Sequence, residues 1–464
     1  MPNSRPKIKL VTLGCAKNEV DSEEIAGVLD ADGFDVDPRS RKHDVIVINT
    51  CGFLESAKLE SVRAIKDAVR EKRAGRAKRV IVAGCLSQRL GVELSRLAPG
   101  ADMYVGVGHM ADFADLARRV LEGSEPYVDV SPPHHRWADV ETRARTGKPW
   151  SAYLKVSEGC DHQCSFCTIP SFRGGHVSKP IERIISEARR LAATGTREIN
   201  LIAQDVTQYG FDLYKAFTLP KLLRVLSEVE GIDWIRILYF YPNRLTDEVI
   251  ETMASLPKVL NYIDIPLQHA HPDVLRRMKR PWDGERYLAL FEKLRRSLPE
   301  VAIRTTFIVG FPGETDAEFD YLIDFVEKAR LDRVGAFPFS REPGTPSYDM
   351  DGQISQKVKN ERYDKLMRRQ KQISLEINQG KIGSQIPILV EELRDGWVCG
   401  RSYRDAPEID GLVYAPGSAA LGSLTPVNIT GAEPYDLYGE LNGQLFSAAR
   451  PLQPLRMAKP VAPL

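Results

Sequence analysis

Short apolar runs rich in β-branched residues alternate with amphipathic segments along the first 123 residues. The apolar runs predict strands at 8–13, 45–49, 80–83 and 103–107. Apolar residues at helical spacing between these runs predict helices. Such alternation is typical of an open parallel sheet with helices on both faces. The stretch 124–150 mixes proline with charge and has no clear period, so we interpret it as a linker or as a loop over a neighbouring domain.

The alternation resumes on a longer scale from Ser151. It predicts six more strands, at 152–157, 198–203, 235–240, 262–267, 303–310 and 333–340. Helical patterns lie between them, for example at 182–193, 219–229 and 285–297. Six such units predict a partial or open parallel barrel, in which reactive groups gather at the C-terminal ends of the strands.

A long charged helix is predicted near 355–378, and a third kind of pattern follows it. Five short strand-like runs, "IPILVEE", "WVCGRSY", "GLVYA", "LTPVNIT" and "DLYGEL", stand between glycine-rich turns, which is typical of a small β-barrel. The predicted fold class is therefore α/β with a C-terminal β-barrel. Its predicted parts are 1–123 (open sheet), 124–150 (linker), 151–373 (partial barrel), 374–441 (β-barrel) and 442–464, a Pro- and Ala-rich tail predicted to be poorly ordered.

Composition narrows the class of protein without identifying it. The net charge of +1 over 464 residues argues against nucleic-acid binding through bulk charge. The N-terminus lacks the apolar core of a secretory signal, and no apolar run approaches the ~18 residues of a membrane span. We therefore expect a cytoplasmic protein without a membrane partner. Cysteines there stay reduced and more often serve metals or catalysis than disulfides.

The segment "CDHQCSFC" places three cysteines in eight positions: Cys160, Cys164 and Cys167. A structural zinc site or a structural iron–sulfur cluster normally takes four protein ligands. Three thiolates on a 4Fe-4S cluster leave one iron open for a substrate or cofactor. Zinc completed by His162 or His176 is the less favoured alternative, because C-x3-C-x2-C is an unusual zinc spacing.

Three other cysteines each follow a predicted strand of the first domain: Cys15, Cys51 and Cys85. In an open parallel sheet these strand ends form the crevice where ligands bind. Adjacent strands lie ~4.8 Å apart, so neighbouring loops can bring three thiols to one point. The pattern indicates a second three-thiolate cluster, with buried structural thiols as the alternative. Cys399, in the predicted β-barrel, has no such partner and is assigned to the core.

Several motifs resemble one family. "CDHQCSFC" resembles the cluster motif of radical S-adenosylmethionine (SAM) enzymes, and "LGCAKNEVDSE", "NTCGFLESAK" and "AGCLSQR" resemble the N-terminal domain of methylthiotransferases. The match continues through "INLIAQDVTQYG", "IPLQHAHPDVLRRMKR", "FIVGFPGETDAEF" and "FSREPGTP", and the C-terminal barrel resembles a TRAM domain. The likeness covers roughly residues 8–440, so the chain is identified as a member of the radical SAM methylthiotransferases.

The resemblance implies two 4Fe-4S clusters, one on each cysteine triplet, with SAM bound to the open iron of the second triplet. Reduction would cleave SAM to a radical that abstracts hydrogen from carbon, the first cluster would present sulfur, and a second SAM would methylate it. The predicted SAM contacts are Gln204, Asp205, Gln268, His269, Gly310 and Gly313. A structural role is the alternative for a lone Gln or His at a strand end.

Two branches of this family differ in substrate. One modifies isopentenyl-adenosine in tRNA, and the other the β-carbon of an aspartate in the twelfth protein of the small ribosomal subunit. "CAKNEVDSE", "NTCGFLESAK", "EGCDHQCSFCTIPSFRG" and "GRSYRDAPEIDG" resemble the second branch. Residues 374–440 hold ten acidic and four basic residues, a net charge of −6, which suits a basic ribosomal protein better than tRNA phosphates. A solvated acidic surface is the alternative.

The same resemblance implies further partners. A one-electron donor such as flavodoxin or ferredoxin is expected, together with a monomeric enzyme and no stable binding of nucleic acid. A two-cluster electron carrier would share the cysteines. It would not need the predicted barrel or the "GFPGE" loop at 310–314, so the enzyme is the favoured interpretation.

Overall fold

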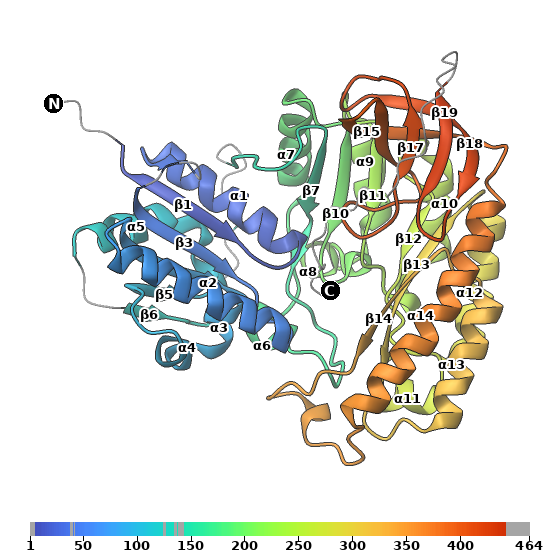
Figure 1. Ribbon diagram of the computed structural model, residues 1–464, viewed down its shortest axis with the longest axis horizontal. Coiled ribbons are helices and arrows are strands. Elements are labelled where there is room, and N and C mark those ends of the chain that lie inside the picture. Colours follow the sequence, from blue (N-terminus) through green and yellow to red (C-terminus); the bar gives the residue numbers. More distant parts are fainter. Residues whose placement is uncertain are drawn as a thin grey trace.

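The computed structural model of the chain describes residues 5–37, 40, 42–123, 127–133, 137 and 143–441. Figure 1 shows an N-terminal sheet domain (blue), a central open barrel (green to orange) and a C-terminal β-barrel (red). The predicted α/β fold class is confirmed. The predicted tail, 442–464, lies outside the described residues. No helix among the described residues is both long enough and apolar enough to cross a membrane.

The N-terminal domain is a six-stranded parallel sheet in the order β2-β1-β3-β4-β5-β6. Its strands are β1 (Lys7–Thr12), β2 (Asp35–Val36), β3 (His43–Thr50), β4 (Ala77–Gly84), β5 (Met103–Val105) and β6 (Tyr127–Asp129). Its helices are α1 (Ala16–Ala31), α2 (Glu55–Arg73), α3 (Cys85–Leu90), α4 (Val92–Leu97), the 3₁₀ turn η1 (Val107–Asp112) and α5 (Phe113–Leu121). Apolar residues of α1 and α5 pack on one face and those of α2 and α4 on the other, which is the expected two-sided arrangement.

The sheet extends into the stretch that we interpreted as a linker. Residues Tyr127–Asp129 form β6 and pair in parallel with β5. Tyr127 packs against the core on one face of the sheet and Val128 against the core on the other. Three residues are too few to show a period of two, so the sequence pattern could not reveal this strand.

The central domain contains the six predicted strands. They are β7 (Ser151–Lys155), β10 (Glu198–Ile202), β11 (Trp234–Ile237), β12 (Tyr262–Asp264), β13 (Ala302–Val309) and β14 (Arg333–Pro338). They form two parallel sheets, β11-β10-β7 and β12-β13-β14. A few backbone hydrogen bonds join the sheets, among them Phe240 N to Asp264 O at 2.8 Å. The result is one open parallel barrel.

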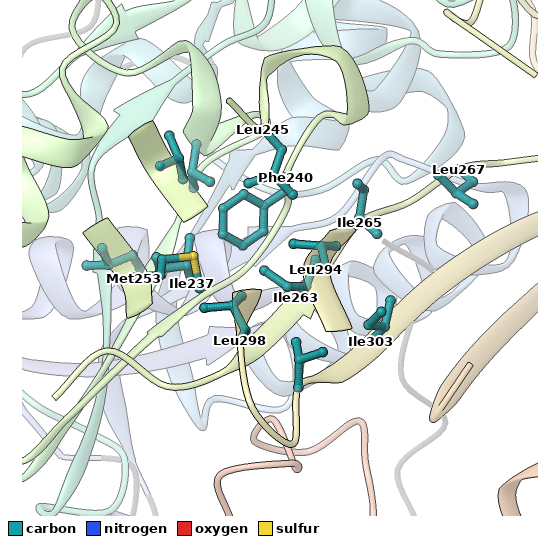
Figure 2. Close-up of a cluster of buried hydrophobic side chains, with 14 of the residues drawn as sticks. Ile237, Phe240, Leu245, Met253, Ile263, Ile265, Leu267, Leu294, Leu298 and Ile303 are labelled. Atoms are coloured by element: carbon teal, nitrogen blue, oxygen red, sulfur yellow. The ribbon is translucent and has the colours of Figure 1, made fainter. Parts of the chain in front are cut away.

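Helices cover the outside of this barrel. They are α7 (Ile181–Ala193), α9 (Leu219–Ser227), α10 (Asp247–Ser255), α11 (Pro272–Arg277), α12 (Gly284–Ser297), α13 (Asp316–Ala329) and α14 (Gln356–Gln379). The shorter elements are β8 (Ser157–Glu158), α6 (Ile169–Arg173), β9 (Val177–Ser178), η3 (Val206–Gln208), α8 (Phe211–Tyr214), η4 (Pro242–Arg244) and η5 (Pro346–Tyr348). Figure 2 shows part of the core between strands and helices, including Ile237, Met253, Ile263, Leu294 and Ile303.

The C-terminal domain is a closed barrel in the order β15-β16-β17-β19-β18. Its strands are β15 (Gln385–Arg394), β16 (Trp397–Ser402), β17 (Val413–Pro416), β18 (Leu424–Ala432) and β19 (Leu437–Leu441). Cys399 is buried in this domain beside Trp397, Tyr414 and Tyr438, as expected of a core residue.

A buried ion pair fastens the β-barrel to the N-terminal ends of the parallel strands. Glu198 is the first residue of β10, and its carboxylate pairs with Arg401 of β16 and with Arg236 of β11. All three side chains are almost fully buried. Burial acts to raise the pKa of Glu198, but the two guanidinium groups outweigh it and lower the pKa to about 2.

Other acids of the β-barrel are used in the same interface. The contacts are Asp405 with Arg333 at 2.9 Å, Asp410 with the Tyr262 hydroxyl at 2.5 Å, and Glu391 with Lys148 at 3.0 Å. Arg401 and Arg404 of the β-barrel are in turn bound to Glu198 and Asp332 outside it. Acids and bases of this domain are therefore both used in internal contacts, and the count of −6 does not by itself indicate a surface that attracts a basic partner.

We predict that Glu198→Gln destabilises the fold by about 3–5 kcal/mol near neutral pH, because it leaves two buried guanidinium groups without their carboxylate. The pKa of Glu198 is depressed from an ordinary 4.5, so its contribution is complete above 4.5 and is lost as the pH falls toward 2. The difference in melting temperature between wild type and variant should therefore shrink across that interval. Glu440→Gln, on an exposed position of β19, is the control. A Glu198→Gln chain as stable as wild type at pH 7 would contradict the prediction.

Candidate functional site

Three cysteines gather at the C-terminal ends of adjacent strands in the N-terminal sheet. Cys15 precedes α1, Cys51 follows β3 directly, and Cys85 begins α3. Strands β1, β3 and β4 are neighbours in the sheet, so the three turns share one edge. The thiols are close enough that the charge of Cys15 acts on both Cys51 and Cys85. The structure thus brings together the first predicted triplet.

Glycines make this approach possible. Gly14 has φ +95°, and a Cβ there would lie 2.7 Å from the Cβ of Cys51. Gly84 has φ +94°, and a Cβ there would lie 2.3 Å from Asn49 Oδ1. Both positions need a left-handed backbone and lack room for a side chain, so only glycine fits.

The second triplet lies in the loop after β8. Cys160, Cys164 and Cys167 are all partly exposed, and Cys167 N donates to Cys164 O at 3.1 Å. Cys164 acts electrostatically on both Cys160 and Cys167, and Cys160 acts on Cys167. A cation stands beside it, because Arg280 Nη1 lies 3.8 Å from Cys164 Sγ.

The histidines that could complete a zinc site have other partners. His162 stacks on Tyr241 with 3.7 Å between ring centroids, and its Nε2 lies 2.7 Å from Asp205 Oδ2. His176 Nε2 lies 3.0 Å from Ser178 Oγ. Both imidazoles are thus held in the surrounding loops.

The spread of the thiols also bears on what they can hold. Among the described residues, one group of His, Cys, Asp or Glu has its ligand atoms all within 4.8 Å of one another, namely His271, Asp273 and Glu318. The thiols of each triplet are therefore spread more widely than that. Tetrahedral zinc with Zn–S of about 2.3 Å would need sulfurs about 3.8 Å apart. In this arrangement neither triplet is spaced for a single tetrahedral zinc ion.

Burial keeps four of the six thiols protonated when no metal is bound. It raises the pKa of Cys51 to about 11 and that of Cys85, Cys160 and Cys167 to about 12. Thiolates are the metal-binding form, so metal binding at either triplet must release protons.

Arg173 links the two triplets. It ends α6, the short helix that follows Cys167 and lies beside the N-terminal domain in Figure 1. Its Nε and Nη2 lie 3.2 and 3.1 Å from Cys85 Sγ. The same buried guanidinium binds Asp21 at 2.9 Å and Glu158 at 2.8 Å. A residue of one triplet's loop thus contacts a cysteine of the other triplet.

A wider set of buried charges joins α1 to the barrel. Asp21 pairs with Lys155 of β7, and Glu23 pairs with Arg143 at 2.6 Å. Arg143 and Lys179 both bind Glu187 of α7, at 2.5 and 2.8 Å. The sequence analysis missed these residues, because "NEVDSEE" looks like a solvated helix face until its partners are placed.

Gln204 and Asp205 follow β10 and bind residues beside and within the loop of the second triplet. Gln204 Nε2 donates to Glu158 Oε1 at 2.8 Å, while its buried Oε1 has no partner among the described residues. Asp205 accepts from Thr207 N at 2.8 Å and holds His162. Gln204 therefore offers an unused buried acceptor, whereas Asp205 is largely occupied by the protein.

Gln268 and His269 follow β12. Gln268 has φ +75°, and its amide donates to Thr306 O at 2.8 Å. His269 is fully buried; its Nδ1 accepts from His271 N at 3.0 Å, and its Nε2 has no hydrogen-bond partner among the described residues. Burial lowers the pKa of His269 to about 3, so the imidazole is neutral.

The glycine-rich turn after β13 is held from behind by α14. Gly310 has φ +73°, and a Cβ there would lie 2.4 Å from Lys359 Cγ. Gly313 N donates to Gly352 O at 2.9 Å. Packing against α14 already explains the glycine at 310, and contact of either glycine with a nucleoside stays a prediction.

Three family descriptions match the chain. The Radical SAM superfamily matches residues 154–326, the uncharacterized protein family UPF0004 matches 7–106, and the TRAM domain matches 382–441.

Among curated proteins, the ribosomal protein uS12 methylthiotransferase RimO of Desulforamulus reducens is 44% identical over 441 residues, 94% of this chain and 99% of the relative. The protein of the same name from Geobacter sulfurreducens is 42% identical over 445 residues, 95% of this chain and 100% of that protein. Among solved structures, the radical SAM methyltransferase TsrM of Kitasatospora setae has a TM-score of 0.55 at 16% identity, covering 87% of this chain and 82% of TsrM. That likeness shows the fold alone.

We predict that Asp21→Asn loosens the N-terminal domain from the barrel, because Lys155 and Arg173 each lose a buried carboxylate. Amides of α1 and β7 should exchange with deuterium faster, consistent with a local loss of about 3 kcal/mol. Asp30→Asn is the matched control on the same helix, since Asp30 and its partner Arg5 are both largely exposed. Equal exchange in the two variants would contradict the assigned role of Asp21.

Proposed function

The chain belongs to the RimO family of radical SAM methylthiotransferases, and we propose on this basis that it adds a methylthio group to the β-carbon of an aspartate in ribosomal protein uS12. One observation supports this most strongly: relatives with that name align with it over nearly their whole length and its own. The two cysteine triplets, linked by the contact of Arg173 with Cys85, agree with the proposal, because a transfer of sulfur by a radical route needs two reactive centres close together.

The family's cofactors are SAM and 4Fe-4S clusters. We assign one cluster to Cys160, Cys164 and Cys167 and another to Cys15, Cys51 and Cys85. Each triplet offers three sulfur donors, which is one fewer than a fully protein-ligated cluster takes and leaves one iron open. When bound, these groups supply the radical that removes hydrogen and the sulfur and methyl group that are transferred. Gln204, whose buried Oε1 has no hydrogen-bond partner among the described residues, remains the best candidate for a contact with SAM, and His269, whose Nε2 lies 3.7 Å from Glu314 Oε2, is the next.

The residues of the chain itself hold the reacting groups, orient them and exclude water from them. An acid–base side chain cannot remove hydrogen from an unactivated carbon, so no general base is assigned. Arg173, which binds Cys85, Asp21 and Glu158, holds the segment after the second triplet against the first triplet. Val20 of α1, Tyr239 of the barrel and Ala406 of the C-terminal domain belong to one apolar cluster inside the barrel, which keeps water from its interior.

Competing functions have less support. A tRNA-modifying enzyme is not favoured by the relatives, and an electron carrier would not need the radical SAM barrel. A ribosomal protein substrate is the reason to place the reaction in the cytoplasm. An electron donor such as flavodoxin or ferredoxin, a monomeric state and the lack of stable nucleic-acid binding stay predictions.

The direct test offers purified uS12 and bulk tRNA in parallel to anaerobically reconstituted enzyme with SAM, sulfide and a reductant. We expect mass spectrometry to find a methylthio group on one aspartate of uS12 and none on tRNA. Modified adenosine in tRNA with unmodified uS12 would refute the proposal.

The cluster assignment predicts the iron content of single variants. Wild type should hold about eight iron atoms, and Cys160→Ala and Cys15→Ala should each lose about four, because each removes a ligand of a different cluster. Cys399→Ala should keep the wild-type content, since Cys399 is a core residue of the β-barrel. Iron and acid-labile sulfide assays provide the measurement. Full iron content in both triplet variants would disprove the assignment.

A further inference from the structure

Lys17 is a buried cation without an acidic partner. It stands in the first turn of α1, two residues after Cys15, and is 8% exposed. Its ammonium forms no ion pair with any carboxylate of the described residues; it lies 3.5 Å from the centroid of the Tyr239 ring. By contrast, Lys155 and Lys179 are equally buried and both bind carboxylates. A buried ammonium left unpaired is costly unless something else compensates for it.

The two acids that act on Lys17 are committed to other cations. Burial lowers the pKa of Lys17 and Arg173 acts in the same direction, while Cys15, Glu158 and Asp264 act to raise it. Glu158 is bound by Arg173 and Lys155, and Asp264 is bound by Arg304 at 2.6 Å. They make the surroundings favourable to a cation without binding the ammonium.

The ring beneath Lys17 is held in a strained backbone. Tyr239 has φ +68°, a left-handed conformation that is strained for a non-glycine residue. Its N–H donates to Asp264 Oδ2 at 3.1 Å, and its carbonyl accepts from Val206 N at 3.1 Å. These contacts fix the ring just past the C-terminal end of β11, under the ammonium. Strain of this kind is typical of functional sites.

Lys17 also lies where the reaction must occur. It belongs to the helix that Cys15 begins, and its electrostatic neighbours include Arg173 and Glu158, which link the two triplets. Tyr239 and Asp264 lie at the mouth of the barrel. The ammonium therefore points to the region shared by both triplets and by the ends of the parallel strands.

We infer that Lys17, seated on Tyr239, is the binding site for the carboxylate of the substrate aspartate. This inference rests on the proposed function. The side chain to be modified carries a carboxylate next to the reacting carbon, and a carboxylate entering this region must be paired when it leaves water. Lys17 is a positioning residue that selects aspartate over its uncharged amide.

SAM also carries a carboxylate, and the experiment separates the two sources. Reconstituted enzyme without reductant, which cannot turn over, is titrated with two fluorescent peptides from uS12, one with the target aspartate and one with asparagine in its place. Wild type, Lys17→Met and Lys17→Gln are compared, and the affinity for SAM is measured on each. Lys66→Met, at an exposed position of α2, is the matched control. Iron content and melting temperature report whether each variant is folded and loaded.

Wild type and Lys66→Met should bind the aspartate peptide at least about tenfold more tightly than the asparagine peptide. Both Lys17 variants should bind the two peptides equally, with unchanged affinity for SAM. Equal weakening toward both peptides would show a merely structural role and overturn the inference, as would a wild type without preference. Loss of SAM affinity alone would assign the ammonium to SAM and overturn it too. If wild-type enzyme with reductant fails to modify the aspartate peptide, the proposed function fails instead.

Discussion

The carboxylates of α1 that are buried between the domains are each paired with a cation, and this constraint sets the geometry of the whole site. Asp21, Glu23 and Glu24 of α1 are almost fully buried, and the opposite charges come from the barrel and from the segment before it. A shift of the N-terminal domain by a few ångströms would leave several of these groups unpaired in a medium that solvates them poorly. The pairing therefore fixes the N-terminal domain, which carries one cysteine triplet, relative to the barrel, which carries the other.

Much of the architecture follows from local patterns. The apolar runs that predict strands in the open sheet, the barrel and the C-terminal domain all correspond to strands, because each run is buried on at least one side. The sequence also predicts that Cys15, Cys51 and Cys85 each follow a strand. This places them on one edge of the sheet, since β1, β3 and β4 are neighbours. A motif tied to a strand end can be positioned from sequence because the strand end itself is predictable.

What the sequence does not reveal is set by contacts between distant segments. In the sequence, Arg173 looks like an ordinary basic residue and Lys17 like part of a polar helix. Their buried contacts are made with residues of another domain, which the sequence does not place. The acidity of the C-terminal barrel is the converse case. Asp405 and Asp410 count as surface charge in the sequence, yet they bind Arg333 and Tyr262 inside the molecule. Burial of a charge depends on tertiary structure, which a linear pattern of polarity does not contain.

The short path from Cys167 to Arg173 has a consequence for how such a chain can diverge. The contact between the two triplets runs through α6 and not through the stretch that connects the domains in sequence. Residues between β6 and β7 can therefore gain, lose or exchange amino acids with little effect on the separation of the triplets, provided that Arg143 still reaches Glu23. Sequence drift should collect in that connection, whereas the spacing from Cys167 to Arg173 should tolerate no insertion.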